Sequence, residues 1–128
     1  MKTVTKIAVR TALILVLVCL LFVVVVHSAF IVSPMSSDSM QPLISTNSTI
    51  IAARWFHTAS LHSGDFVIAD IPLPDSNRVL TVRQIEQQSD TLAGQFYLRA
   101  ANTNGLDSRQ FGTLPASNIV GRVLWVLK

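Results

Sequence analysis

Two polar stretches of this chain hold residue types that could carry out chemistry. The first reads Ser37-Asp38-Ser39-Met40-Gln41-Pro42, and the second reads Leu106-Asp107-Ser108-Arg109-Gln110-Phe111-Gly112. A serine hydroxyl is a weak nucleophile until a neighbouring base removes its proton, so serine chemistry needs a base nearby. Taken alone, the first stretch has the composition of a linker. The second stretch, and the order in which further motifs follow, favour a functional interpretation.

The chain offers little for metal or thiol chemistry. Its only cysteine, Cys19, lies in an apolar run, and its histidines are His27, His57 and His62. Three histidines spaced so widely do not form the ligand pattern of a zinc site. We therefore expect no metal and no cofactor.

An apolar run from residue 11 to residue 32 lies near the N-terminus. It contains no charged residue, and about 20 apolar residues are enough to cross a bilayer as a helix. A cleaved signal peptide is the alternative, because Val26-His27-Ser28 could mimic a small-residue cleavage site. The run is longer than the roughly 7–15 residues of a usual signal-peptide core. We predict a cytoplasmic segment at 1–10, a retained transmembrane helix at 11–32 and an extracytoplasmic domain at 33–128.

The distribution of charge predicts the orientation of this anchor. The net charge of +3 equals the three bases before the span, Lys2, Lys6 and Arg10, because acids and bases balance in the rest of the chain. The positive-inside rule then places the N-terminus in the cytoplasm and the domain outside, as in a single-pass protein of the plasma membrane. A neutral external domain gives no support for nucleic-acid binding.

The external part predicts an all-β domain of about five or six strands, because short β-rich runs alternate with turn residues. The expected strands are residues 49–54, 66–71, 79–85, 96–99 and 119–127. Trp55 and Phe56 are expected at the lipid interface, where aromatic residues are favoured. Trp125 is expected in the core, although the interface is an alternative, because it lies in an apolar strand.

Together with the apolar helix, the ordered motifs resemble the type I signal peptidase family. That family shows S-x-S-M-x-P just after a transmembrane segment, then a Gly-Asp-led strand, and then a Lys-Arg or His-Arg strand. A Gly-Asp-Asn loop follows, running into D-S-R-x-x-G and a final G-R. The corresponding residues here are 37–42, 64–67, 77–79, 101–102 with 107–112, and 121–122. The resemblance covers residues 8–128 and implies a small, coiled β-sheet domain anchored by one N-terminal transmembrane helix.

The resemblance also implies roles for individual residues. Ser39 stands at the position of the nucleophile. Ser37 stands at the position of a serine whose hydroxyl joins the Ser39 amide in the oxyanion hole, which stabilises charge that develops in the transition state. Two further pairs match: Asp107 and Arg109 as a buried supporting pair, and Met40 and Pro42 as groove residues that could instead anchor the first turn.

The general base of the family is missing from its expected position. Family members place Lys or His directly before Arg-Val on the central strand, and Asn77 stands there in this chain. An alternative register pairs Val82-Arg83 with the Lys-Arg motif and puts valine at the base position. Neither asparagine nor arginine accepts a proton near neutral pH. Two supporting positions differ as well: Gly105 stands in place of a serine, and Ala101 in place of the loop aspartate.

Other candidates for the base are weaker. His57 and His62 both precede the Gly64-Asp65 strand, and exposed loop histidines are the simpler interpretation. Asp38 adjoins Ser39, but neighbouring side chains in an extended segment point apart. A partner subunit that supplies the base in trans is a further possibility.

Two functions remain open on these grounds. The first is a membrane-anchored serine endopeptidase that cuts exported or secreted precursor polypeptides near the bilayer and binds them as extended strands. The second is a catalytically inactive relative that keeps the peptide groove and serves as a binding or assembly factor for exported proteins. A third interpretation, an anchored β-domain of unrelated function, is disfavoured by the ordered motifs.

Overall fold

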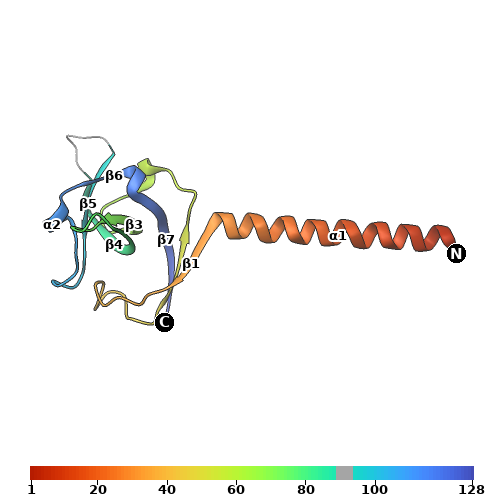
Figure 1. Ribbon diagram of the computed structural model, residues 1–128, viewed down its shortest axis with the longest axis horizontal. Helices are drawn as coiled ribbons and strands as arrows, with labels where there is room; N and C mark the ends of the chain where they lie inside the picture. Colours follow the sequence, from red (N-terminus) through yellow and green to blue (C-terminus); the bar gives the residue numbers. More distant parts are fainter. Residues whose placement is uncertain (89–93) are drawn as a thin grey trace.

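A long N-terminal helix leads directly into a curved β-domain (Figure 1). The structure, a computed structural model, describes residues 1–88 and 94–128. Helix α1 (Lys2–Ala29) contains 28 residues, none of them buried against the domain. It is long and apolar enough to cross a membrane, with a mean hydropathy of 3.0 over its most apolar window.

The helix differs in its bounds from the expected span at 11–32. It begins at Lys2, because residues 2–10, which precede the expected span, contain no proline or glycine, and it ends at Ala29. Phe30 already has the extended backbone of a strand. The aromatic and β-branched residues that follow the helix pair with a neighbouring strand, which offers them backbone hydrogen bonds of another kind.

Within the described residues, seven strands form one antiparallel sheet in the order β1-β2-β7-β3-β4-β5-β6. The strands are β1 (Phe30–Pro34), β2 (Thr49–Ala53), β3 (Phe66–Pro72), β4 (Arg78–Gln88), β5 (Gln95–Arg99), β6 (Leu114–Pro115) and β7 (Ile119–Leu127). The remaining elements are short: η1 (Thr58–Ser60), α2 (Ser108–Phe111) and η2 (Ala116–Asn118). The prediction of an all-β domain with one N-terminal helix is confirmed. All five expected strands are present, and β1 and β6 are additional.

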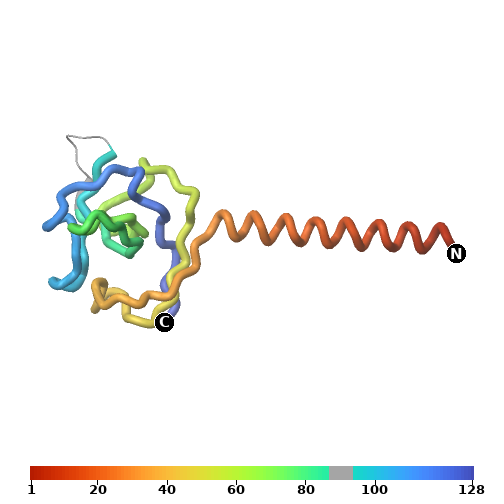
Figure 2. The backbone as a smooth tube through the Cα atoms, in the orientation of Figure 1, coloured from red at the N-terminus to blue at the C-terminus, as the bar shows by residue number. Residues whose placement is uncertain are grey.

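The sheet is buried on both faces near its middle. Successive side chains of a strand point to opposite faces, and in β3 Val67 and Ala69 contribute to one apolar cluster while Ile68 contributes to the other. The first cluster consists of Leu61, Val67, Ala69, Ile71, Ile85, Phe96, Leu98, Leu114 and Ile119. The second consists of Met35, Met40, Ile44, Ile50, Ala52, Ile68 and Val82. Figure 2 shows that the backbone curls into a rounded domain at one end of α1.

The prediction that Trp125 lies in the core is wrong. Trp125 is 60% exposed, because it lies opposite Ile51 on the outer face of the sheet, whereas the buried residues of β2 are Ile50 and Ala52. Trp125 pairs with Ile51 of β2, which in turn pairs with Val32 of β1. Val32 is exposed as well, so the outer face of β1, β2 and β7 carries an uncovered apolar row.

Candidate functional site

A groove with a volume of about 440 Å³ lies between β1 and β4. Residues 33–37 line one side and residues 79–83 line the other. Ile50, Ile68 and Val120, from the three strands between β1 and β4, also contribute to the lining. Strands that are separated by three others can face a common groove only because the sheet curves.

Both sides of the groove present unpaired strand edges. Strand β1 is the first strand of the sheet and pairs with β2 alone. Strand β5 pairs with the part of β4 that begins at Gln84, so within the described residues the segment 78–83 has a strand partner only in β3. Unpaired edges expose backbone N–H and C=O groups that an added strand can bind.

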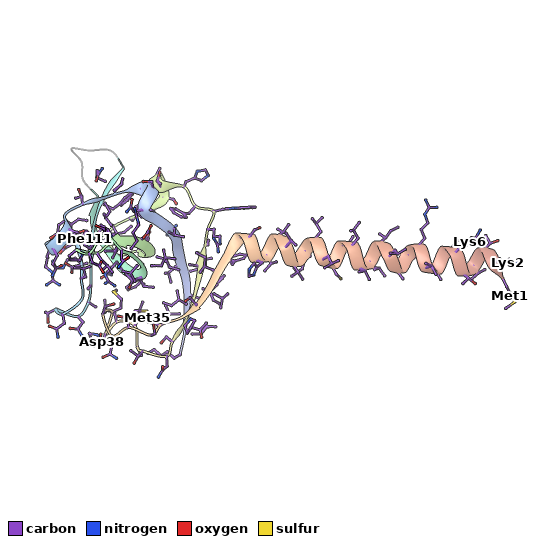
Figure 3. The ribbon with its side chains drawn as sticks, viewed as in Figure 1. Met1, Lys2, Lys6, Met35, Asp38 and Phe111 are labelled. Carbon is purple, nitrogen blue, oxygen red and sulfur yellow. The ribbon has the colours of Figure 1, made fainter. Side chains whose placement is uncertain are left out.

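Ser39 lies at the end of the groove, on the segment that follows β1. It is 5% exposed. Its backbone N–H donates to Ser37 Oγ over 3.1 Å, so the two residues expected to form an oxyanion hole do lie together. Figure 3 shows two other residues of this segment, Met35 and Asp38, on the same lower side of the domain.

Arg83 of β4 is the residue that reaches the Ser39 hydroxyl. Its Nη1 donates to Ser39 Oγ over 2.9 Å, and also to Thr81 Oγ1 and to the Val82 carbonyl. Its Nε donates to the Leu106 carbonyl over 2.8 Å. Burial lowers the pKa of Arg83, and the nearby Asp107 opposes that effect. A guanidinium nevertheless stays protonated in proteins, so a cation, rather than a proton acceptor, contacts Ser39.

The structure does not bring Asn77 to Ser39. Asn77 lies in the turn before β4, where its side-chain amide donates to Asp75 Oδ2 over 2.6 Å, a bond that lowers the pKa of Asp75. It precedes Arg83 by six positions, or about 20 Å along an extended strand. The expectation that Asn77 stands opposite Ser39 is therefore corrected. The β4 residue that contacts Ser39 is Arg83. The register with Val82-Arg83 in place of Lys-Arg was closer, although Arg83 rather than Val82 contacts Ser39.

Motif matching does not identify Arg83 as the partner of Ser39, because it compares residue types and not the positions of side chains along a strand. The available signal was strand parity: Thr81 and Arg83 lie on one face of β4, and an arginine stands there among apolar neighbours. A buried arginine in a strand requires several acceptors. That pattern indicates a polar site.

The loop after β5 packs directly on Ser39. The backbone N–H of Asn102 donates to the Ser39 carbonyl over 2.9 Å. Gly105 fits without a side chain: a Cβ there would lie 2.5 Å from Ala100 Cβ and 3.1 Å from Ser39 Cβ. The serine expected at position 105 by resemblance therefore has no room beside Ala100.

Asp107 and Arg109 form an ion pair, as the resemblance implies, but only Asp107 is buried and Arg109 is exposed. Asp107 is fully buried and caps α2, accepting from the Arg109 backbone N–H, the Arg109 guanidinium and the Ala100 N–H. Burial alone would raise the pKa of Asp107, but these hydrogen bonds outweigh it, and its pKa lies below the usual range. The same contact raises the pKa of Arg109. The pair ties the end of β5 to the loop that contacts Arg83.

Met40 and Pro42 do not line the groove. Met40 is fully buried in the second apolar cluster, and Pro42 is exposed beside it. The alternative, that these residues anchor the first turn, fits Met40. The groove is lined instead by Met35, Ser36 and Ser37 of the same segment.

The other candidate bases lie apart from Ser39 in their contacts. His57 and His62 are exposed in the β2–β3 connection, and among the described residues neither has a hydrogen bond to Ser39. Asp38 is exposed, and its carbonyl rather than its carboxylate is engaged by the Asn102 side chain. Within residues 1–88 and 94–128, no group of three or more His, Cys, Asp or Glu residues could hold a metal ion.

Comparison with known proteins leaves the family open. No family model matches the chain, and no curated protein matches it. The resemblance to signal peptidases therefore rests on the ordered motifs and stays a prediction.

Proposed function

We propose that this chain is a membrane-anchored, signal-peptidase-like protein that binds extended segments of exported polypeptides without cutting them. The observation that carries the proposal is the groove between the end of the edge strand β1, with the segment 35–37 that follows it, and the unpaired edge of β4 at residues 79–83. A peptide in that groove would add a strand to the sheet on both sides. Its backbone would supply affinity, and its alternate side chains would meet the apolar lining.

The place of the groove favours polypeptides that emerge at a membrane. Strand β1 begins at the residue that follows α1, so only the strand itself separates the groove from an apolar helix of 28 residues. The charge distribution supports an orientation with the domain outside the cytoplasm. The motif order supports exported precursors as the source of the bound segment.

The contact of Arg83 with Ser39 supports binding over hydrolysis. Attack by a serine requires that a neighbouring base take its proton, and Arg83 occupies that place as a permanent cation. One of the two expected oxyanion donors is also engaged, because the Ser39 amide already donates to Ser37 Oγ. The described part of the chain gives Ser39 Oγ no carboxylate or histidine partner.

Peptide binding by the full chain in lipid nanodiscs tests this proposal. We would titrate a fluorescein-labelled peptide of alternating alanine and valine, and follow its anisotropy. The matched control is the same peptide N-methylated at every second amide, which removes strand hydrogen bonds but keeps the side chains. We expect N-methylation to weaken binding about tenfold or more, because several backbone hydrogen bonds of about 1 kcal/mol are lost. Equal affinities, or no binding of either peptide, would contradict strand addition.

The second candidate function is the serine endopeptidase. One observation favours it: Ser37 and Ser39 have the mutual arrangement that the resemblance implies, at the end of the same groove. A base from a partner subunit would then complete the site.

Cleavage of a membrane-presented precursor separates the two candidates. We would compare the wild type with Ser39→Ala, Arg83→Lys and the double variant. We expect an inert wild type, and cleavage by Arg83→Lys that is lost in the double variant, because a buried lysine can lower its pKa and act as a base. Cleavage by the wild type that disappears in Ser39→Ala would show that the chain is an active peptidase and refute the non-cutting proposal.

A further inference from the structure

The groove is basic at both ends, which an apolar peptide strand does not by itself require. Of the described residues that line it, two are arginines, Arg54 and Arg83, and none is acidic. Arg54 follows β2 beside the start of β1, and its backbone N–H donates to Ala29. Arg83 stands beside Ser37, at the other end of the lining segments. The occupant should therefore carry negative charge at one end or both.

Arg83 has donors to spare for such a charge. A guanidinium has five N–H donors. Nε and Nη1 are bound to protein acceptors, whereas the described residues give Nη2 no hydrogen-bond partner. Nη2 is not among the buried polar atoms that lack a partner, so part of its surface is accessible, and Arg83 is one of the residues that line the groove.

The charge of Arg83 also lacks direct neutralisation. The acid that influences it electrostatically is Asp107, whose oxygens bind Arg109 and the Ala100 N–H instead. No salt bridge is formed by Arg83 among the described residues. A cation that is 4% exposed and has no ion-pair partner favours binding of an anion.

The relative direction of β1 and β4 defines how a peptide that ends at Arg83 would run along the groove. Four antiparallel pairings connect β1 to β4 through β2, β7 and β3, so β1 and β4 run in the same direction. Ser37 and Arg83 are the last residues of the two lining segments. A peptide whose C-terminal carboxylate lies beside Arg83 and Ser37 would therefore run parallel to both strands.

We infer that the groove captures peptides by their free C-terminal carboxylate, with Arg83 Nη2 and the Ser37 hydroxyl as its donors. This inference rests on the proposed function and names its ligand class: the free C-terminal end of an extended polypeptide. Ser37 Oγ accepts from the Ser39 amide, which leaves its own hydrogen free to donate. Guanidinium and hydroxyl donors together suit a planar carboxylate.

Matched peptide acids and amides test the inference. The probes are two N-terminally labelled peptides of alternating alanine and valine, about five residues long to match five lining positions on each strand. One ends in a carboxylate and the other in a carboxamide, and both are titrated against the full chain in nanodiscs. We expect the acid to bind about 10- to 100-fold more tightly, because charge-assisted hydrogen bonds are formed by the acid alone.

Two variants locate the effect. Arg83→Gln should abolish the preference for the acid. Arg54→Gln, which removes a cation from the opposite end of the groove, should keep the ratio of the two affinities. The wild-type comparison needs no variant, so it decides the question even if Arg83→Gln does not fold.

The outcomes separate the inference from the proposal beneath it. Equal binding of acid and amide by the wild type overturns carboxylate capture and leaves strand addition standing. An acid preference that persists in folded Arg83→Gln overturns the assignment to Arg83. Binding of neither peptide overturns the proposed function and the inference with it.

Discussion

Gly105 offers a sharp steric test of the loop that holds Ser39. Substituting alanine adds one Cβ, which would lie 2.5 Å from Ala100 Cβ and 3.1 Å from Ser39 Cβ. The backbone of Gly105 is not in the left-handed region, so the substitution acts through space rather than through φ. Both contacts involve atoms fixed to the backbone, and a rotamer change cannot relieve them.

The size of the effect follows from these distances. Overpacking of a filled site costs about 1–3 kcal/mol, and a contact about 1 Å inside the ordinary range belongs at the upper end, so we expect Gly105→Ala to cost about 2–3 kcal/mol. Ala100→Gly alone should cost about 1 kcal/mol, from one lost methyl group and added backbone freedom. The double variant removes the closest contact. It should therefore be more stable than the sum of the single effects by about 2 kcal/mol.

Urea denaturation of the full chain in detergent, followed by circular dichroism, measures this coupling. The matched control replaces the neighbouring alanine, since Ala101→Gly removes a methyl group that does not oppose Gly105. It should give no rescue of Gly105→Ala. A coupling below about 0.5 kcal/mol, or equal rescue by both alanine positions, would refute the packing described here.

Two further predictions concern the buried carboxylate and the tryptophans. Asp107→Asn should lower the free energy of unfolding by about 2 kcal/mol at pH 7, since the buried side chain then loses the charge-assisted character of its hydrogen bonds from the Ala100 and Arg109 backbone N–H groups. Because the folded-state pKa of Asp107 is lowered, its contribution is present above the unfolded pKa of about 3.9 and is lost as the pH falls through the folded pKa. The urea midpoint of the wild type should thus decline in acid more steeply than that of Asp107→Asn, and parallel pH profiles would contradict this. Trp55 and Trp125 are the only tryptophans and are 73% and 60% exposed. Brominated lipids should quench their fluorescence in nanodiscs, and quenching should persist in Trp125→Phe, in which Trp55 is the remaining tryptophan. Unquenched emission would place these side chains in water.

The strands were predictable because their physics is local. Alternating β-branched runs bounded by turn residues identified β2, β3, β4, β5 and β7. Strand β1 was not predicted, since its Phe-Ile-Val run continues the apolar composition of the helix. Composition alone does not show where the helix ends and the strand begins. The prediction for Trp125 was wrong for a related reason. An apolar strand has two buried faces only if other elements of the protein cover both faces of the sheet, and that depends on tertiary structure.

The site was predictable in part. The neighbouring Ser37 and Ser39, and the pair of Asp107 and Arg109, come from short segments whose spacing limits their geometry. The bond from Arg83 to Ser39 spans 44 positions, and no local pattern fixes such a contact. Motif matching aligned Asn77 by its neighbour Arg78, whereas the fold selects a side chain by its height along β4 and by the face on which it lies.

The direct junction of α1 and β1 limits the distance between the helix and the groove. Helix α1 ends at Ala29 and β1 begins at Phe30, so no linker allows the domain to drift from its anchor. Ser37 follows Ala29 by eight positions, which sets an upper limit of about 26 Å between the helix end and the end of the groove at Ser37. With α1 in a bilayer, a segment bound in the groove would be held within that height. A chain still attached to the membrane could present its end there only if its own tether were long enough to reach that height, so tether length would contribute to selection alongside sequence.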